Sequence, residues 1–195
     1  MAGNDPKSSA PPPAGAPDLS RLRGKRILVG VTGGIAAYKT CTIVSRLAQA
    51  GAEVTVAMTP AATHFVTPLT FQALSARPVY TSAWEHIESH DPQHIALADA
   101  ADLALVAPCT MDCLARLATG RTDDVVTLIL SAVDRRKTPT FLAPSMNSAM
   151  WQQPSTQRNL KTLTGDGFRM IGPADGWQAC RHTGPGRMSE PDEIL

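Results

Sequence analysis

Short apolar runs that alternate with segments of helical periodicity constrain the fold of this chain most strongly. The first run covers residues 26–31, and a turn with two glycines separates it from residues 35–49, where apolar residues recur at helical spacing. The next apolar run covers residues 53–58. A strand, a helix and a strand in this order predict two parallel strands joined by a right-handed crossover.

The same alternation continues to the end of the chain and predicts a doubly wound α/β sandwich around a parallel sheet. We expect Pro108 and Pro144 to end the strands before them, because proline cannot donate to a ladder. Thr122 or Asp123 is expected to cap the helix that follows. Further strands are predicted at 78–80, 102–107, 140–143 and 169–171, helices at 68–75, 94–101, 110–119, 123–133 and 154–164, a turn or short helix at 60–65, and a polar loop at 84–93.

Composition divides the chain into a tail and one domain. Residues 1–22 are rich in Pro, Ala, Gly and Ser, and such a segment cannot bury enough apolar surface to offset its ordering entropy. We therefore predict a disordered tail at 1–22 and one domain at 23–195, a size that supports its own core.

Charge and hydropathy exclude several classes of partner. The 18 Lys and Arg residues nearly balance the 17 Asp and Glu residues, and nucleic-acid binding needs clustered positive charge, so no nucleic-acid partner is expected. Apolar runs are shorter than the roughly 18 residues of a membrane helix, so no membrane partner is expected either. Four cysteines without a secretory signal indicate a reducing, cytoplasmic compartment rather than a disulfide framework.

Ligands of such sheets bind beyond the carboxyl ends of the strands, where the strand order reverses. The candidate loops therefore follow Val31, Met58, Ala107 and Ala143. In the first loop, Gly33-Gly34 opens a helix, and its free N–H groups suit an anion such as phosphate. The spacing is neither the dinucleotide nor the P-loop pattern, so a plain tight turn remains equally open.

The next two candidate loops carry hydroxyls and thiols. Thr59 can cap the following turn or donate its hydroxyl to a phosphate. Thr110 is placed to cap a helix whose exposed N–H groups again suit an anion. Cys109 and Cys113 are four residues apart, but a metal site needs two further converging ligands. Packed thiols are therefore the favoured interpretation, and no metal is predicted.

Three further residues have both a structural and a chemical interpretation. His94 at a helix start can be structural, or can transfer a proton near neutral pH. Asn147 can cap a helix or hold a carboxylate. Cys180 lies in a glycine-rich loop beside Arg181 and His182, and neighbouring cations favour thiolate character.

Taken together, these motifs resemble those of the flavin-containing cysteine decarboxylases, over residues 25–195. Within that family the chain most resembles the phosphopantothenoylcysteine decarboxylases. The resemblance rests on seven segments: GGIAAYK at 33–39, His94, APCTMD at 107–112, PSMN at 144–147 with MW at 150–151, TQRNL at 156–160, Cys180, and GPGRM at 184–188.

The resemblance implies a flavodoxin-like, three-layer fold, FMN as cofactor, and a homotrimer that is sometimes built into a dodecamer. It implies decarboxylation of 4′-phosphopantothenoylcysteine to 4′-phosphopantetheine in coenzyme A biosynthesis, through thioaldehyde and enethiol intermediates. In many bacteria a synthetase domain follows on the same chain. That domain is not in this sequence, so we expect a separate phosphopantothenate–cysteine ligase, or a chain cut from a bifunctional protein.

The resemblance also assigns roles to residues. His94 is implied as the active-site histidine, and Cys180 as the proton donor of the final reduction. Asn147 is implied to hold the substrate carboxylate, with Met146 and Ala179 beside the substrate. The implied FMN contacts are Gly33, Gly34, Ile35, Thr59, Thr110, Met111, Asp112, Cys113 and Ser145.

Alternatives and departures accompany the resemblance. A peptidyl-cysteine decarboxylase of the same fold and a non-catalytic flavin-binding regulatory subunit remain open, although the latter is expected to lack His94, Asn147 or Cys180. A prenyl-flavin synthase shares the fold but not the Asn147 and Cys180 pairing. Cys113 stands where a hydroxyl residue is usual, and losing one donor costs about 1 kcal/mol of phosphate binding. Arg181 stands where Gly is usual, which is expected to stiffen the flap that carries Cys180.

Overall fold

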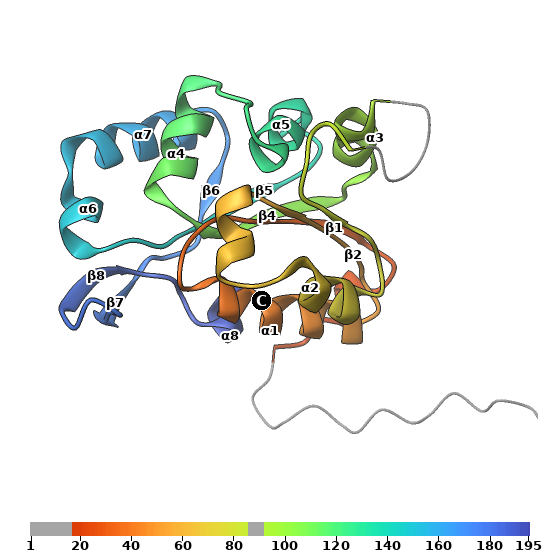
Figure 1. The fold of residues 1–195 in the computed structure, drawn as a ribbon, viewed down its shortest axis with the longest axis horizontal. Coiled ribbons are helices and arrows are strands. Elements are labelled where there is room, and N and C mark those ends of the chain that lie inside the picture. The colour runs from red at the N-terminus through yellow and green to blue at the C-terminus, as the bar shows by residue number, and fades with distance from the viewer. Residues whose placement is uncertain (1–16, 86–91) are drawn as a thin grey trace, which may run out of the picture.

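The computed structural model of the chain describes residues 17–85 and 92–195, and a six-stranded parallel sheet forms its centre (Figure 1). Every neighbouring pair in the order β3-β2-β1-β4-β5-β6 is parallel. The strands are β1 (Arg26–Val31), β2 (Glu53–Met58), β3 (Val79–Tyr80), β4 (Leu103–Cys109), β5 (Thr140–Pro144) and β6 (Arg169–Met170). The predicted doubly wound, flavodoxin-like α/β fold is confirmed.

Helices cover both faces of this sheet and make a three-layer sandwich (Figure 1). One face carries α1 (Ala37–Gln49), α2 (Pro68–Ser75) and the C-terminal α8 (Pro191–Ile194). The other face carries α3 (Gln93–Ala100), α4 (Met111–Thr119), α5 (Val125–Ala132) and α7 (Pro154–Gly165). Three short elements complete the layers: the 3-10 helices η1 (Ser20–Leu22) and η2 (Pro60–His64), and α6 (Ser148–Gln152).

Two apolar clusters separate because successive strand residues point to opposite faces. In β1, Val29 and Val31 belong to the cluster under α1, whereas Leu28 belongs to the cluster under α5. Gly30 also faces α5, where a Cβ would stand 2.8 Å from a Val126 methyl group. Glycine at this position therefore lets α5 lie close to the sheet.

The strand order reverses between β1 and β4, which lie side by side although β2 and β3 come between them in the sequence. The carboxyl ends of these two strands diverge into helices on opposite faces. This arrangement opens a crevice at the end of the sheet. The loops predicted to bind a ligand meet there.

Some predicted boundaries were wrong. Pro108 does not end its strand: β4 continues to Cys109, which pairs with Pro144 in β5, across a register shift that begins after Val106. An irregularity of this kind is where a strand tolerates proline. The cap of α5 is Asp124, whose carboxylate accepts from Thr127 N–H over 2.9 Å, rather than Thr122 or Asp123.

The sequence did not predict α6 or the two strands of an antiparallel hairpin, β7 (Ala174–Trp177) and β8 (Thr183–Arg187). The short α8 was also missed. Residues 1–16 of the predicted tail, and 86–91 of the predicted polar loop, lie outside the described residues. Within the described end of the predicted tail, η1 forms one turn and Leu22 packs against the core.

Candidate active site

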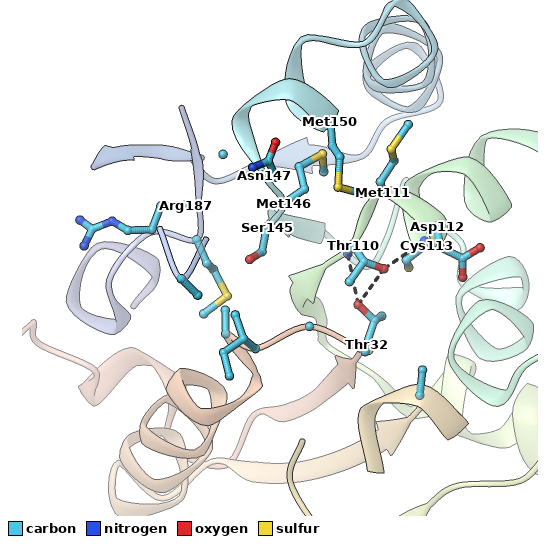
Figure 2. A pocket seen from close by; sticks show the side chains of 18 of the residues that line it. Thr32, Thr110, Met111, Asp112, Cys113, Ser145, Met146, Asn147, Met150 and Arg187 are labelled. Carbon is cyan, nitrogen blue, oxygen red and sulfur yellow. Dashed lines mark hydrogen bonds between the residues drawn. The ribbon is translucent and has the colours of Figure 1, made fainter. Parts of the chain in front are cut away.

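A cavity of about 1040 Å³ lies at the carboxyl ends of β1, β2, β4 and β5. All four loops predicted to bind a ligand line it, together with the β7–β8 hairpin. In Figure 2, Ser145, Met146 and Asn147 come from the loop after β5, and Thr32 and Thr110 meet at another part of the wall. The reversal of strand order thus places a chemically varied crevice where the sequence predicts one.

The glycine turn after β1 passes very close to its neighbours. A Cβ on Gly33 would stand 2.4 Å from the Cβ of Ala61 in η2, a distance that no pair of side chains adopts. A Cβ on Gly34 would stand 3.3 Å from a methyl group of Thr110. The turn therefore needs glycine at its first position for packing, and it exposes backbone at the cavity wall.

A network of two hydroxyls joins this turn to the loop after β4. The Thr32 hydroxyl is buried and donates to the carbonyl oxygen of Pro108 over 2.7 Å. Thr32 Oγ1 accepts from the N–H of Thr110 over 3.1 Å, and Thr110 Oγ1 accepts from the N–H of Cys113 over 3.3 Å (Figure 2). The predicted cap of α4 is confirmed. The network joins the loop before α1 to the start of α4 at one part of the cavity.

The two thiols of the α4 loop are buried. Cys109 is fully buried and Cys113 is 2% exposed. The neighbouring Cys109 and burial together raise the pKa of Cys113 well above its ordinary value, so its thiol stays protonated. All four cysteines are free, and the described residues hold no group of three or more His, Cys, Asp or Glu that could bind a metal ion.

Asn147 begins α6, the helix that the sequence did not reveal. Its side-chain oxygen accepts from Ala149 N–H over 2.8 Å, which is a helix cap. The same cap orients the amide nitrogen, which donates to Cys180 Sγ over 3.1 Å. The predicted helix cap is therefore confirmed. The same conformation leaves the amide nitrogen pointing toward Cys180, so a role in holding a carboxylate is compatible with the cap.

The hairpin docks against the Asn147 loop through its main chain. The N–H of Met146 donates to the carbonyl oxygen of Gly186 over 2.9 Å. A Cβ on Gly186 would stand 2.4 Å from the Met146 carbonyl oxygen, and one on Gly184 would stand 2.6 Å from Ser148 Oγ. Both glycines also have positive φ angles. Side chains are thus excluded from two positions of β8 so that the hairpin can approach.

Cys180 lies in the turn at the tip of the hairpin and is exposed to the cavity. The residue after it, Arg181, has a φ of 65°, a left-handed conformation that favours glycine. This is the position where the resemblance leads us to expect glycine. The tip therefore keeps a glycine-type turn although the side chain is an arginine.

Charged residues gather where β8 meets α1. Lys39 is 8% exposed, and its ammonium donates to Glu190 over 2.8 Å and to the Met188 carbonyl oxygen over 3.2 Å. Arg187 also pairs with Glu190, at 3.1 Å, and its buried Nε has no hydrogen-bond partner among the described residues. Lys39, and then Arg187, hold the pKa of Glu190 below its ordinary value. Two cations thus share one carboxylate at the cavity wall.

The structure brings together nearly all residues that the resemblance assigns to the site. Those that line the cavity are Gly33, Gly34, Ile35, Thr59, Thr110, Met111, Asp112, Cys113, Ser145, Met146, Asn147, Ala179 and Cys180. Thr59 also caps η2, accepting from Ala62 N–H over 3.3 Å. His94 is half-buried on α3 and does not line this cavity.

Several lining residues received no individual role from the sequence, and four of them bear directly on the site. Thr32, Lys39, Gln178 and Arg187 all line the cavity. Thr32 directly precedes the glycine turn and Lys39 lies in the first turn of α1, so their nearness to this turn was the available signal. The burial of Gln178 follows only from the hairpin, which the sequence concealed.

Comparison with known proteins gives consistent similarities. The chain is 48% identical over 175 residues to the coenzyme A biosynthesis bifunctional protein CoaBC of Haemophilus influenzae, covering 90% of this chain and 43% of that protein. The chain thus spans less than half the length of this curated relative. Among solved structures, a PPC decarboxylase mutant complexed with pantothenoylaminoethenethiol matches with a TM-score of 0.79 and 34% identity, over 88% of this chain and 94% of the other.

A second solved structure, the FMN-dependent cysteine decarboxylase SpaF, matches with a TM-score of 0.74 and 31% identity, over 85% of this chain and 91% of the other.

No helix in the described parts of the chain has the length and apolar character needed to cross a bilayer. The sequence profile named Flavoprotein matches residues 16–195, nearly the whole chain. With its glycine turn and threonine hydroxyls at the switch point of a flavodoxin-like sheet, this chain belongs to the Flavoprotein family.

Proposed function

We propose that the chain decarboxylates 4′-phosphopantothenoylcysteine to 4′-phosphopantetheine with FMN as cofactor, a step of coenzyme A biosynthesis. The observation that carries the proposal is the contact of Asn147 with Cys180, 3.1 Å apart in one cavity with the glycine turn. An amide that can bind a carboxylate and a thiol that can give a proton are the two groups this reaction requires. The named relatives support the substrate class.

The residues of the cavity fit FMN. A flavin phosphate needs backbone N–H groups and hydroxyls, and the turn at Gly33 and Gly34 with the start of α4 supplies them. Thr110 and Thr59 add hydroxyls at the cavity wall. A cavity of about 1040 Å³ has room for a flavin and a substrate together. We place the isoalloxazine near Ser145 and the phosphate near Thr110.

Bound FMN supplies the redox chemistry that turns the substrate thiol into a group able to accept the electrons left by CO₂. The chain supplies orientation and proton control. The Asn147 amide, held by its cap on α6, donates to the substrate carboxylate and aligns it. Cys180 covers the substrate from the hairpin and gives its Sγ proton to carbon in the final reduction. The cavity walls keep water from the reactive enethiol.

The cationic pair at the cavity wall favours a phosphorylated substrate. Lys39 and Arg187 share the single carboxylate of Glu190, so these three side chains together carry one net positive charge. A phosphate monoester is an effective partner for such a pair. We therefore propose phosphopantothenoylcysteine rather than a peptidyl cysteine as the substrate.

We further propose that the active unit is a homo-oligomer, a trimer or a dodecamer built from trimers, in which His94 of the partner subunit completes the site. In the single chain, α3 with His94 and the hairpin with Cys180 lie at opposite sides of the sandwich (Figure 1). Two inactive variants, His94→Asn and Asn147→Asp, are expected to regain decarboxylation when they are co-assembled. Failure to regain activity in verified mixed oligomers would reject the shared site.

Two further proposals concern a partner enzyme and the cellular location. A phosphopantothenate–cysteine ligase is the proposed functional partner, since the H. influenzae relative is named a bifunctional protein. A reducing, cytoplasmic location is proposed because all four cysteines are free.

The decisive experiment measures flavin and CO₂ together. The purified protein is expected to show a yellow flavin spectrum and to release CO₂ from phosphopantothenoylcysteine. A peptide with a C-terminal cysteine is assayed in parallel. Turnover of the peptide alone would replace the proposed substrate by a peptidyl cysteine, and flavin binding without turnover of either would indicate a regulatory subunit.

A further inference from the structure

Gln178 is a buried polar residue between β7 and the tip of the hairpin. It is 7% exposed, although its neighbours Trp177 and Ala179 are exposed. Its amide nitrogen donates to the carbonyl oxygens of Gly184 and Pro185, over 3.3 and 2.9 Å. The side chain therefore ties the start of the turn to the returning strand β8.

The amide oxygen of Gln178 faces the other way and joins two functional segments. It accepts from the N–H of Ser148 over 3.2 Å, directly after Asn147. Cys180 Sγ donates to the same oxygen over 3.6 Å. The amide oxygen of Gln178 thus contacts both the start of α6, directly after Asn147, and the thiol of Cys180.

Cys180 consequently has two side-chain partners with opposite roles. Asn147 Nδ2 donates to its sulfur, and Gln178 Oε1 accepts its proton. A thiol with both a donor and an acceptor has one favoured rotamer and one favoured S–H direction. Without the acceptor, only the contact with Asn147 would remain, and the approach of a substrate carboxylate to Asn147 would remove that contact as well.

We propose that Gln178 is a positioning residue that holds the Cys180 thiol over the substrate for the final proton transfer. Its amide nitrogen fixes Gln178 to the hairpin, and its amide oxygen sets the place of the sulfur relative to Asn147. This role depends on the proposed decarboxylase function only for its catalytic consequence. The contact between Gln178 and the thiol stands without it.

The first test measures the alkylation rate of Cys180 by iodoacetamide in the flavin-loaded protein, followed by mass spectrometry of its peptide. Gln178→Met keeps the length of the side chain but removes the acceptor, and is expected to speed alkylation about fivefold or more. Gln178→Glu, like Gln178→Met, loses the amide donor to β8, but it keeps an acceptor oxygen and adds a negative charge beside the sulfur, which disfavours the thiolate that the reagent attacks. This variant is expected to react more slowly than the unaltered protein.

Opposite responses distinguish a direct contact from a loosened hairpin, because loosening would speed alkylation in both variants. Gln157→Met is the matched control: Gln157 also donates from its amide to a backbone carbonyl, that of Trp151, over 2.7 Å, but on the exposed side of α7. Its alkylation rate is expected to equal that of the unaltered protein. Equal acceleration by both Gln178 variants, or no change in either, would overturn the proposal. If Gln178→Met loses its flavin, the Gln178→Glu rate decides alone: slower alkylation supports the contact, and unchanged or faster alkylation overturns it.

The second test measures the products. Gln178→Met is expected to raise the ratio of unreduced to saturated thiol product about tenfold. In a Cys180→Ala background the same substitution is expected to change that ratio no further, because Gln178 acts through the thiol. An added effect in that background would overturn the positioning role. If the unaltered protein turns over neither cysteine substrate, the proposed function fails, while the alkylation rates still decide the contact.

Discussion

The side chain of Asn147 joins two structures at once: its oxygen caps α6 at Ala149, 2.8 Å away, and its nitrogen donates to the thiol of Cys180 over 3.1 Å. The bond to Ala149 fixes the rotamer of Asn147, and this rotamer directs the amide nitrogen toward the β7–β8 hairpin. A single amide therefore links local helix formation to the geometry of the cavity. Substitutions at this residue separate the two roles.

Asn147→Asp is expected to keep the cap of α6 and to lose decarboxylation. A carboxylate caps a helix as well as an amide does, so urea unfolding should be nearly unchanged. The same carboxylate repels a substrate carboxylate, and CO₂ release should fall at least about 100-fold. Asn147→Ala, in contrast, should lose about 1 kcal/mol of stability as well. Near-normal CO₂ release by the aspartate variant would remove Asn147 from carboxylate binding.

Gly33→Ala is expected to disrupt the glycine turn. The added Cβ would stand 2.4 Å from that of Ala61, so η2 must move, which costs about 1–3 kcal/mol. FMN affinity should fall about tenfold or more because the turn forms part of the proposed cradle. Fluorescence titration of FMN measures this loss.

Gly165→Ala serves as the control for the glycine substitution. Gly165 ends α7 with open space around its Cβ position, and alanine there should stabilise the helix by about 0.5–1 kcal/mol. Its FMN affinity should stay normal. Equal effects of the two substitutions on FMN would contradict the cradle at Gly33.

Arg181→Gly is expected to stabilise the hairpin tip. Arg181 has a φ of 65°, and a side chain in this region costs about 1–2 kcal/mol relative to glycine. The gain is reduced because glycine also raises the entropy of the unfolded chain. Differential scanning calorimetry should show a small rise in melting temperature. A fall would show that the arginine side chain makes a stabilising contact that outweighs its backbone cost.

Arg187→Gln is expected to weaken recognition of the substrate phosphate. KM for phosphopantothenoylcysteine should rise about tenfold, while kinetics with dephosphorylated pantothenoylcysteine should change little. Arg136→Gln is the control, because Arg136 pairs with Asp134 at the surface and does not line the cavity. An equal loss with both substrates would argue against a phosphate contact.

Stability at low pH should depend on Glu190. Its pKa is lowered in the folded chain by Lys39, so the pair contributes fully above the ordinary value of 4.5 and is lost as the pH falls through the lower folded value. Glu190 is 44% exposed, and the effect is therefore modest. Urea midpoints between pH 6 and 3 should fall less steeply in Lys39→Met than in the control Lys161→Met. Identical slopes would show that the pair is not coupled to unfolding.

Much of the central sheet was predictable because its parallel strands are continuous apolar runs bounded by residues typical of turns. β1 and β2 have the predicted bounds, and α2 also begins and ends as predicted. The cap of α5 was not resolved by sequence, since Thr122, Asp123 and Asp124 are all competent and tertiary contacts select among them. At Pro108 a register shift accommodates a residue that normally ends a strand.

The hairpin was hidden for a different reason. Glycines at 176, 184 and 186 and a proline at 185 conceal the alternation by which strands are recognised. With the hairpin concealed, neither the burial of Gln178 nor its contact with Cys180 could be predicted. The pairing of Asn147 with Cys180 was predictable only through resemblance, because the two lie 33 residues apart with no local pattern between them.

The close approach of Gly184 and Gly186 to the Asn147 loop has a consequence for how proteins of this fold diversify. The hydrogen bonds that seat the hairpin on this loop run from Met146 N–H to the Gly186 carbonyl oxygen and from Ser148 N–H to the Gln178 side chain, while the tip contributes the contact of Cys180 with Asn147. The tip can therefore vary in sequence, and in the thiol chemistry that it contributes, while the hairpin remains seated. Selection can thus exchange what covers the substrate without rebuilding the scaffold beneath it.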